Sequence, residues 1–282
     1  MNQEVQPLLS IIIPVKDNLS GLQKTLDVVF ALNQPTESIE LIVVDGGGCR
    51  HTEQFLLENQ HRIHHIRSAS DSGIYHAMNY GKGCATAPWV WFCGAGDLPV
   101  EETWLAFLPE MKGWAPDELH VFGVDLGNER EIGVPSHYPP RWDESLIWRN
   151  TTHHQGVIYP RAIIQATDFK PAYSILADYA MHLHFWSAGV QASLHDATWS
   201  LIETGGVSRN FGVRLYWQEW KLKRRTIRGW KRAVQPFWLL IKFGFKKSGI
   251  HRTGAACHRA ERRSRRHRCS RGDLGPGRRR RG

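Results

Sequence analysis

Residues 70–99 read SDSGIYHAMNYGKGCATAPWVWFCGAGDLP, a stretch that predicts a polar loop, a helix, a strand and a terminal carboxylate in succession. The run from Trp89 to Cys93 has the length and apolar character of a buried strand, which Gly94 and Gly96 end. Asp97 therefore follows the carboxyl end of this strand. At that edge of an open α/β sheet the loops leave a crevice in which ligands bind, although an ordinary turn aspartate is the alternative interpretation.

Two strand–helix units precede this stretch. Leu8–Val15 is a nearly continuous aliphatic run of strand length, typical of a parallel strand covered on both faces, and apolar residues at helical spacing follow it. Ile39–Val44 repeats the strand pattern, ends in Asp45 and three glycines, and leads into a helical segment over 52–59. Ile63–Arg67 indicates a third strand. This alternation predicts the α/β fold class, with a mostly parallel sheet and helices on both faces.

The overall composition is that of a globular protein. At 282 residues and 41% hydrophobic residues the chain can bury a sizeable core. It has no run of about eighteen apolar residues, and its first residues lack the basic and apolar pattern of a signal peptide, so a cytoplasmic location is expected. The five scattered cysteines lack paired CxxC spacing and predict reduced thiols.

Charge is segregated along the chain. Residues 1–208 hold 12 Lys+Arg and 24 Asp+Glu, residues 209–250 hold 12 and 1, and residues 251–282 hold 12 and 2. An acidic body followed by a basic part favours contact of that part with a phosphate-rich surface. The alternative, RNA or DNA binding through the arginine-rich end, needs base-reading chemistry that the sequence lacks, so no specific nucleic-acid partner is expected.

Seven motifs resemble those of a known family: IIIPVKDN, IVVDGGG, SDSGIYHAMNYGKG, WFCGAGD, HHQGVIYPR, ILADYAMHLHFWSAG and GGVSRN, in this order. Together they resemble the inverting GT-A glycosyltransferases of family 2, and nearest the bacterial extracellular-polysaccharide enzymes of the colanic-acid type. The resemblance implies a Rossmann-like GT-A catalytic domain over 1–210. It also implies an enzyme of the hexosyltransferase class that moves one sugar, with inversion, from a nucleoside diphosphate sugar to a growing, lipid-linked surface saccharide.

The resemblance assigns residues to the nucleotide-sugar donor. The loop after the first strand is expected to embrace the nucleotide, Asp45 to bind its base, and two polar residues to lie near the ribose and the sugar. For Asp71 a helix-capping role is an equal alternative. The family's usual GGSxDGT reads GGGCRHT here, which is a departure in the loop beside the base. The residues expected at the donor are Pro14, Val15, Lys16, Asp17, Asp45, Asp71 and Asn79.

Asp97 matches the last acid of the family's D-x-D-like motif, which binds a divalent cation, magnesium or manganese, that bridges the donor diphosphate. Here Gly94, Ala95 and Gly96 precede it, so the earlier acid is missing. A hard cation often takes only one or two carboxylates and completes its shell with water and substrate phosphates. A single aspartate can therefore serve, with weak metal affinity in the absence of donor.

Asp178 matches the family's catalytic base, which takes a proton from the acceptor hydroxyl. Its position at the beginning of a predicted helix also fits a residue that only stabilises the helix dipole. His154 and Gln155 match a loop beside the active site and are expected on the acceptor side. Trp142 and Trp148 could stack on sugar rings there, or belong to the core.

The C-terminal part changes character. Residues 211–250 interleave aromatic and basic residues, which predicts a basic amphipathic helical segment. Two interpretations are open: the segment lies in an anionic membrane surface, which would make the protein peripheral on the inner face of the cell membrane, or it is a helical pair that packs on the catalytic domain. Residues 251–282 carry only arginine as cation, and they predict a disordered tail or a reading-frame artefact.

The two altered motifs leave a second function open. A catalytically inactive GT-A domain, kept as a membrane-associated assembly partner, would also explain GGGCR and GAGD. Donor hydrolysis or sugar transfer in an assay separates the two functions, because an inactive domain would show neither.

Overall fold

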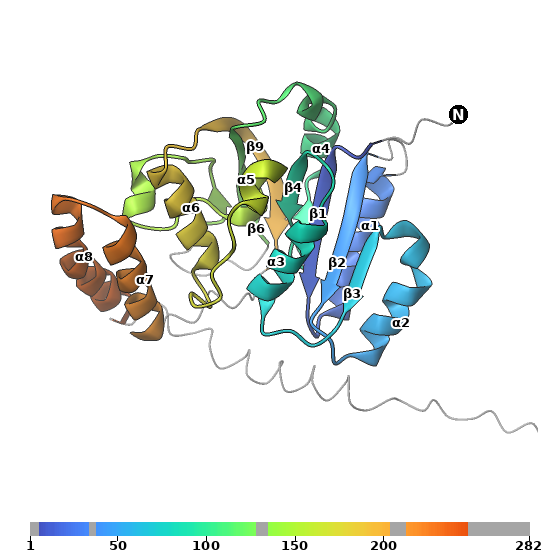
Figure 1. Ribbon diagram of the computed structural model, residues 1–282, viewed down its shortest axis with the longest axis horizontal. Helices are drawn as coiled ribbons and strands as arrows, with labels where there is room; N and C mark the ends of the chain where they lie inside the picture. The colour runs from blue at the N-terminus through green and yellow to red at the C-terminus, as the bar shows by residue number, and fades with distance from the viewer. Residues whose placement is uncertain (1–5, 34–37, 128–134, 204–212, 248–282) are drawn as a thin grey trace, which may run out of the picture.

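The computed structural model describes residues 6–33, 38–127, 135–203 and 213–247 (Figure 1). Its described strands form one nine-stranded sheet in the order β3-β2-β1-β4-β8-β6-β9-β5, with β7 paired to β6. The α/β fold class is therefore confirmed. The GGVSRN motif and the predicted tail over 251–282 lie outside the described residues.

One half of the sheet is parallel. There β1 pairs with β2 and β4, and β2 pairs with β3. The bounds of these strands are β1 (Leu9–Val15), β2 (Ile39–Asp45), β3 (His65–Ser68) and β4 (Trp89–Phe92).

The other half of the sheet is mixed. Strand β8 runs antiparallel to both β4 and β6, β6 is parallel to β9, and β5 and β7 add antiparallel pairs to β9 and β6. The expectation of a mostly parallel sheet therefore holds only for the first half, because a buried apolar run does not reveal strand direction. These strands are β5 (Leu98–Pro99), β6 (Leu119–Leu126), β7 (His137–Tyr138), β8 (Val157–Pro160) and β9 (Ala192–Ile202).

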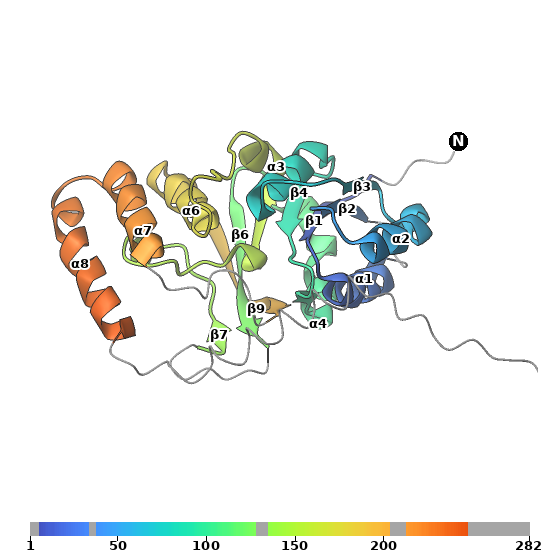
Figure 2. The same ribbon diagram turned by 90° about the horizontal axis from the view of Figure 1, so that it is seen from below.

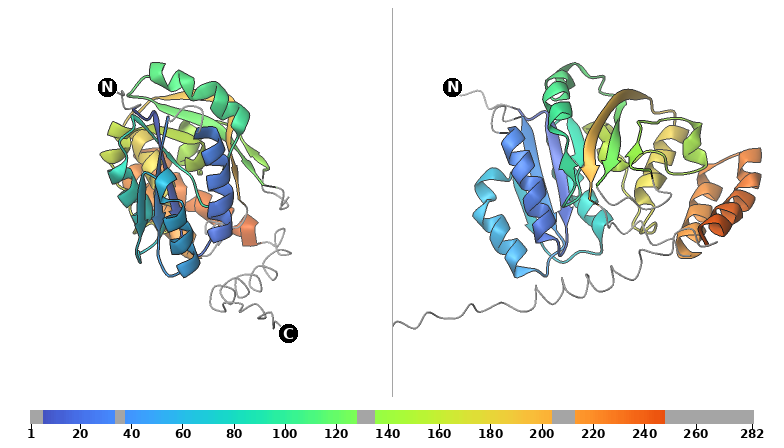
Figure 3. Two further views of the ribbon diagram at one scale, coloured as in Figure 1. Left: turned by 90° about the vertical axis from the view of Figure 1, so that its right-hand side faces the viewer. Right: turned by 180° about the vertical axis from the view of Figure 1, so that it is seen from behind.

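Helices cover both faces of the sheet, as Figures 2 and 3 show. The face with α1, α2 and α4 encloses one apolar core, and the face with α3, α5 and α6 encloses the other. Along β1, Ile11 and Ile13 enter the first core and Ile12 enters the second, since side chains alternate along a strand. The helices are α1 (Leu19–Asn33), α2 (Arg50–Glu58), α3 (Ile74–Cys84), α4 (Glu101–Phe107), α5 (Arg161–Gln165) and α6 (Ala177–Ser187).

Four short 3-10 turns join these elements. They are η1 (Gln60–Arg62), η2 (Pro109–Gly113), η3 (Glu144–Ile147) and η4 (His154–Gly156). The last of them leads directly into β8 and carries two of the predicted site residues.

A helical hairpin of α7 (Val213–Thr226) and α8 (Trp230–Lys247) ends the described chain, at the side of the molecule opposite α2 (Figures 1 and 3). It packs on the body of the protein: Lys223 Nζ and Trp238 Nε1 both donate to the backbone carbonyl of Trp148, at 2.8 and 3.0 Å. The predicted basic helical segment thus exists as a helical pair on the catalytic part. No helix among the described residues is long and apolar enough to cross a membrane.

Candidate active site

The loops that follow β1 and β2 meet the segment after β3 at the carboxyl edge of the parallel strands. The Gly46 N–H donates to the carbonyl of Val15 at 2.8 Å, which ties the ends of β1 and β2 together. A Cβ atom on Gly46 would lie 3.1 Å from Lys16 Cδ and 3.2 Å from Asp71 Oδ1. Lys16 and Asp71 therefore both lie beside the backbone of Gly46.

The other two residues of the predicted nucleotide loop flank this point. Pro14 lies within β1, opposite Val44 of β2. Asp17 is exposed and has a left-handed φ of 52°, a conformation that aspartate tolerates better than most residues. This backbone turns the chain from β1 into α1.

Asp45 is fully buried at the end of β2. Its Oδ1 atom accepts from the Gly47 N–H at 3.2 Å, and its Oδ2 atom accepts from Ser68 Oγ at 2.6 Å. These two donors fix the orientation of a carboxylate that retains further lone pairs for a ligand N–H. Ser68, the last residue of β3, was not predicted from the sequence.

Asp71 forms a turn ahead of α3. Its Oδ1 atom accepts from the Gly73 N–H at 2.9 Å, and α3 has no side-chain cap at its N-terminus. The helix-capping alternative for Asp71 is therefore wrong, and its carboxylate stays beside Gly46, as Lys16 does.

Asn79 does something other than what the family match implied. Its Nδ2 atom donates to the carbonyl of Phe169 at 2.8 Å, and its Oδ1 atom accepts from the Phe169 N–H at 2.9 Å. The amide thus clamps α3 to the segment between α5 and α6. Because this clamp occupies both ends of the amide, we leave Asn79 out of the donor site proposed below.

Asp97 lies in the tight turn between β4 and β5 and is 5% exposed. Its Oδ2 atom accepts from the Gly94 N–H at 3.0 Å and from Gln155 Nε2 at 3.3 Å, and its Oδ1 atom accepts from the Glu203 N–H at 2.9 Å. Burial raises the pKa of the Asp97 carboxyl, although these donors and the nearby His154 oppose the rise. This buried turn favours the ionised carboxylate less than water does. A bound cation would favour the ionised form.

Glu203 brings a second carboxylate to the Asp97 turn. Gly96 has a φ of 109°, and a Cβ atom there would come within 2.7 Å of Glu203 Cδ, so only glycine leaves room for this acid. Asn18 links the same parts, because its Nδ2 atom donates to the Ala95 carbonyl at 2.7 Å and lies 3.4 Å from Glu203 Oε2. Neither Asn18 nor Glu203 was predicted as a site residue.

The residues of this turn fit a divalent cation that takes most of its ligands from elsewhere. Within the described ranges no three His, Cys, Asp or Glu side chains gather closely enough to form a complete metal site. Asp97 already accepts three hydrogen bonds, which leaves about one of its four lone-pair positions. Diphosphate oxygens and water would have to supply the remaining ligands, which is common for magnesium.

Asp178 lies in the first turn of α6 and is 9% exposed. Tyr75 Oη donates to its Oδ1 atom at 3.3 Å, and His154 Nδ1 donates to its Oδ2 atom at 3.4 Å. Burial would raise the pKa of Asp178, but the hydrogen bond and charge of His154, with smaller contributions from His182 and the Tyr179 N–H, outweigh it and lower the pKa to about 2. The carboxylate is thus ionised at neutral pH and is held by α3 and η4.

A buried histidine, His182, lies one turn after Asp178 in α6. His182 is fully buried, and its Nδ1–H donates to the Thr152 carbonyl at 3.2 Å while its Nε2 atom accepts from Tyr159 Oη at 2.6 Å. This pattern fixes the neutral tautomer, because a carbonyl can only accept and Nε2 must then offer its lone pair. Burial lowers the pKa of His182 to about 4, against the attraction of Asp178.

Two neighbouring residues connect the two acids. In η4, His154 contacts Asp178 and Gln155 contacts Asp97. The predicted metal ligand, the predicted base and the predicted acceptor-side loop therefore form one site. Tyr75 and Glu203, which sequence reasoning missed, both had a signal: Tyr75 lies in one of the seven motifs and Glu203 lies two residues before another.

Comparisons with known proteins show the family of this chain. The family model for glycosyl transferase family 2 matches residues 10–166. A curated protein named PGL/p-HBAD biosynthesis glycosyltransferase, from Mycobacterium tuberculosis, is 28% identical over 214 residues, which are 72% of this chain and 79% of that protein. The protein of the same name in Mycobacterium bovis matches equally well. The colanic-acid type expected from the motifs is not supported by these relatives.

Solved structures show the fold. The structure of residues 1–349 of S. aureus TarS in complex with UDP-GlcNAc has a TM-score of 0.59 and 16% identity, covering 86% of this chain and 73% of that one. A mannosyltransferase from Pyrobaculum calidifontis in complex with GDP-Man and Mn2+ has a TM-score of 0.56 and 14% identity, covering 95% and 84%. At these identities the likeness to both structures is one of fold.

Proposed function

Because the chain belongs to glycosyl transferase family 2, we propose that it transfers one sugar from a nucleoside diphosphate sugar to a lipid-linked saccharide, with inversion at the anomeric carbon. The observation that carries the proposal is η4, in which adjacent residues reach the two buried acids Asp97 and Asp178. An acid at the diphosphate and an ionised base at the acceptor are the two groups that a single displacement needs.

The donor would bind across the carboxyl ends of β1 and β2. Asp45 would accept a hydrogen bond from a base N–H, and Lys16 would approach the phosphates beside Gly46. The complexes of the two structural neighbours with UDP-GlcNAc and GDP-Man support a nucleoside diphosphate sugar as the donor class. The altered loop GGGCR lies on the base side of this site.

Asp97 would hold a divalent cation, with magnesium or manganese the expected ions. The cation would stabilise the negative charge that develops on the departing diphosphate. Asp97 itself is kept in place by the Gly94 and Glu203 N–H groups and by Gln155. The carboxylate of Glu203 adds negative charge beside Gly96 that favours a cation there.

Asp178 would act as the general base. Its carboxylate takes the proton of the acceptor hydroxyl while that oxygen attacks the anomeric carbon and the bond to the diphosphate breaks. Its low pKa keeps it ionised, and the hydroxyl proton becomes acidic enough for transfer only as the new bond forms. Tyr75 and His154 hold the carboxylate in one orientation.

The acceptor is proposed to be lipid-linked, with the protein peripheral on the inner face of the cell membrane. The support is the hairpin α7–α8, which presents exposed apolar and basic residues at one end of the molecule. Assembly of an exopolysaccharide of the colanic-acid type remains the prediction of the motifs alone, since the named relatives act in PGL/p-HBAD biosynthesis.

A donor screen tests the proposal. The thermal unfolding midpoint is measured with a panel of nucleoside diphosphate sugars, each with and without manganese, and released nucleoside diphosphate is assayed for the donors that stabilise the protein. One donor should raise the midpoint in a manganese-dependent way and be hydrolysed slowly or transferred. If no donor stabilises the protein and none is consumed, the proposed activity is wrong and the inactive-domain function gains support.

A further inference from the structure

The hairpin α7–α8 combines buried polar side chains with exposed large apolar ones. It buries polar side chains, namely Gln218, Glu219, Lys223 and Gln235, none more than 7% exposed. It exposes large apolar ones, namely Trp217, Trp230, Val234, Phe237, Leu240 and Ile241, of which Phe237 and Trp230 are 68% exposed. Soluble proteins rarely expose a contiguous apolar surface of this kind without a binding partner.

The buried polar residues attach the hairpin to the protein. Lys223 and Lys242 both pair with Glu219, at 2.8 and 2.7 Å, and Lys223 also donates to the Trp148 carbonyl. Burial lowers the pKa of Lys223 to about 8 in spite of the Glu219 charge. Because Glu219 is the only acidic residue in 213–247 and lies on the inner side, the outward surface of the hairpin carries cations without anions.

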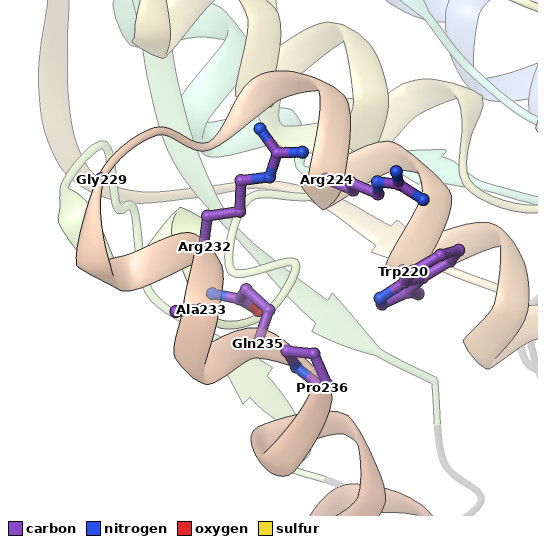
Figure 4. Close-up of a pocket in the computed structure, with 7 residues that line it drawn as sticks. All are labelled: Trp220, Arg224, Gly229, Arg232, Ala233, Gln235 and Pro236. Carbon is purple, nitrogen blue, oxygen red and sulfur yellow. The ribbon is translucent and has the colours of Figure 1, made fainter.

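A pocket of about 300 Å³ opens between the two helices (Figure 4). Two arginines, one from each helix, lie at its lining, and Figure 4 shows their guanidinium groups on the same side of it. Arg224 lies over the Trp220 ring at 5.2 Å, and the Trp220 ring stacks on Trp217 at 4.9 Å between centroids. The lining residues are Trp220, Arg224, Gly229, Arg232, Ala233, Gln235 and Pro236.

The pocket is continuous with the apolar surface of α8. Phe237 follows the lining residue Ala233 by four residues, Leu240 follows the lining residue Pro236 by four, and Ile241 follows Phe237 by four, so this exposed stripe borders the pocket along α8. Leu239, which follows the lining residues Arg232 and Gln235 by seven and four residues, packs inward beside the pocket. The guanidinium groups therefore line the pocket, and the exposed apolar stripe borders it.

We propose that this pocket binds the phosphate headgroup of an anionic membrane phospholipid, with Arg224 and Arg232 as its ligands and the stripe of Phe237, Leu240 and Ile241 in contact with the acyl region. Guanidinium groups suit phosphate because they offer paired N–H donors. An amphipathic basic helix with aromatic residues on its apolar face is typical of interfacial binding. The inference rests on the proposed use of a membrane-borne acceptor and gives the membrane contact a specific site.

Other occupants fit the surface less well. A second copy of the hairpin would bring two cationic surfaces together without anions between them. A nucleic acid would satisfy the arginines but would leave the apolar stripe in water, since its backbone offers phosphate contacts. A phospholipid satisfies both parts of the surface at once.

The test compares two variants that remove equal charge. R224Q/R232Q alters the pocket, and R225Q/R228Q removes two exposed cations of the same hairpin outside the pocket. Flotation of the full chain with vesicles of phosphatidylcholine, alone or with about one part in three of phosphatidylglycerol, measures the apparent affinity. The pocket variant should lose about tenfold more affinity for the anionic vesicles than the control variant.

Equal losses in the two variants would overturn the proposal, because they would mean attraction to surface charge without a site. If inorganic phosphate alone stabilises the wild type against heat as much as vesicles do, and if R224Q/R232Q abolishes that effect, the pocket belongs to a free phosphate ligand and the lipid proposal is wrong. F237S/L240S should weaken vesicle binding; if light scattering shows instead that it dissolves a dimer, the face belongs to a second copy.

Donor-induced thermal stabilisation tests the proposed activity separately from the lipid site. Both arginine variants should retain the wild-type response to donor and manganese, since neither touches the site around Asp97 and Asp178. A wild type that binds anionic vesicles through the pocket and responds to no donor would refute the proposed activity and leave the lipid site standing. A wild type that responds to a donor, and whose vesicle binding does not depend on the pocket arginines, would support the proposed activity and refute the lipid site.

Discussion

Protonation of His182, which lies one turn after the proposed base in α6, should destabilise this protein in mild acid. In the fold this residue is fully buried, donates from Nδ1 to Thr152 and accepts at Nε2 from Tyr159. Protonation would place a second donor opposite the Tyr159 hydroxyl and a charge in an apolar environment. These are the reasons why burial lowers the pKa of His182 to about 4 from its ordinary value of 6.5.

The sign and size of the effect follow from proton linkage. Between pH 6.5 and about 4 the unfolded chain binds a proton at His182 that the folded chain refuses, so the free energy of unfolding falls as the pH falls. The loss from this residue should be about 2 kcal/mol at pH 5 and approach about 3 kcal/mol below pH 4, measured from neutral pH. Above pH 6.5 both states are neutral at this residue and the effect vanishes.

Urea unfolding of the wild type and of H182Q at about pH 7.5 and pH 5 measures this contribution. Glutamine can still exchange hydrogen bonds with Tyr159 but does not titrate, so the difference between the two pH values should shrink by about 2 kcal/mol in the variant, whatever its stability at neutral pH. H184Q changes an exposed histidine of the same helix and should keep the wild-type difference. The same pH difference in the wild type and H182Q would refute the reasoning.

Three substitutions in the site extend the test. D178N should lower transfer by roughly 10²–10⁴-fold while donor and manganese still raise the unfolding midpoint; loss of donor binding in a folded variant would mean that Asp178 is not the base. D97N should lower turnover by orders of magnitude and abolish the manganese-dependent part of donor stabilisation, and near-native metal-dependent activity would contradict the metal assignment. N79A should cost about 1–3 kcal/mol of stability, because it leaves the buried backbone of Phe169 without partners, and should spare donor affinity; the opposite pattern, seen by urea unfolding and donor titration, would restore Asn79 to the donor site.

Local pattern was enough to find the elements of the parallel half of the sheet. The run Leu8–Val15 became β1 at Leu9–Val15, and Ile39–Val44 became β2 at Ile39–Asp45, with Asp45 as its last residue. Asp97 follows β4 at Trp89–Phe92. Buried parallel strands are continuous apolar runs, and turn residues end them, so a sequence displays both features directly. The Oδ1 atom of Asn18, the residue before α1, accepts from the Gly21 N–H at 3.2 Å, as an N-cap side chain does.

Residues that join distant segments were beyond the reach of local pattern. Glu203 donates its N–H to Asp97 across 106 positions of sequence, because β5 pairs with β9 and carries the Asp97 turn to the end of that strand. Asn79 looked like a donor ligand on the family match, and only the position of Phe169 shows that its amide is a clamp. A polar side chain in a motif can bind a ligand or hold two segments of the chain together, and only the packing around it distinguishes the two roles.

The direction of β8 is the feature on which the whole site depends. Residues of η4 immediately precede β8, and β8 runs antiparallel to β4, with Trp89 opposite Pro160 and Val90 opposite Tyr159. The beginning of β8 therefore lies at the carboxyl end of β4, where Asp97 is. Had β8 run parallel to β4, the same residues would lie at the opposite edge of the sheet, and Gln155 could not reach Asp97. An apolar run of four residues predicts a buried strand but not the direction of that strand. The sequence of β8 therefore does not predict that the residues just before it reach both Asp97 and Asp178.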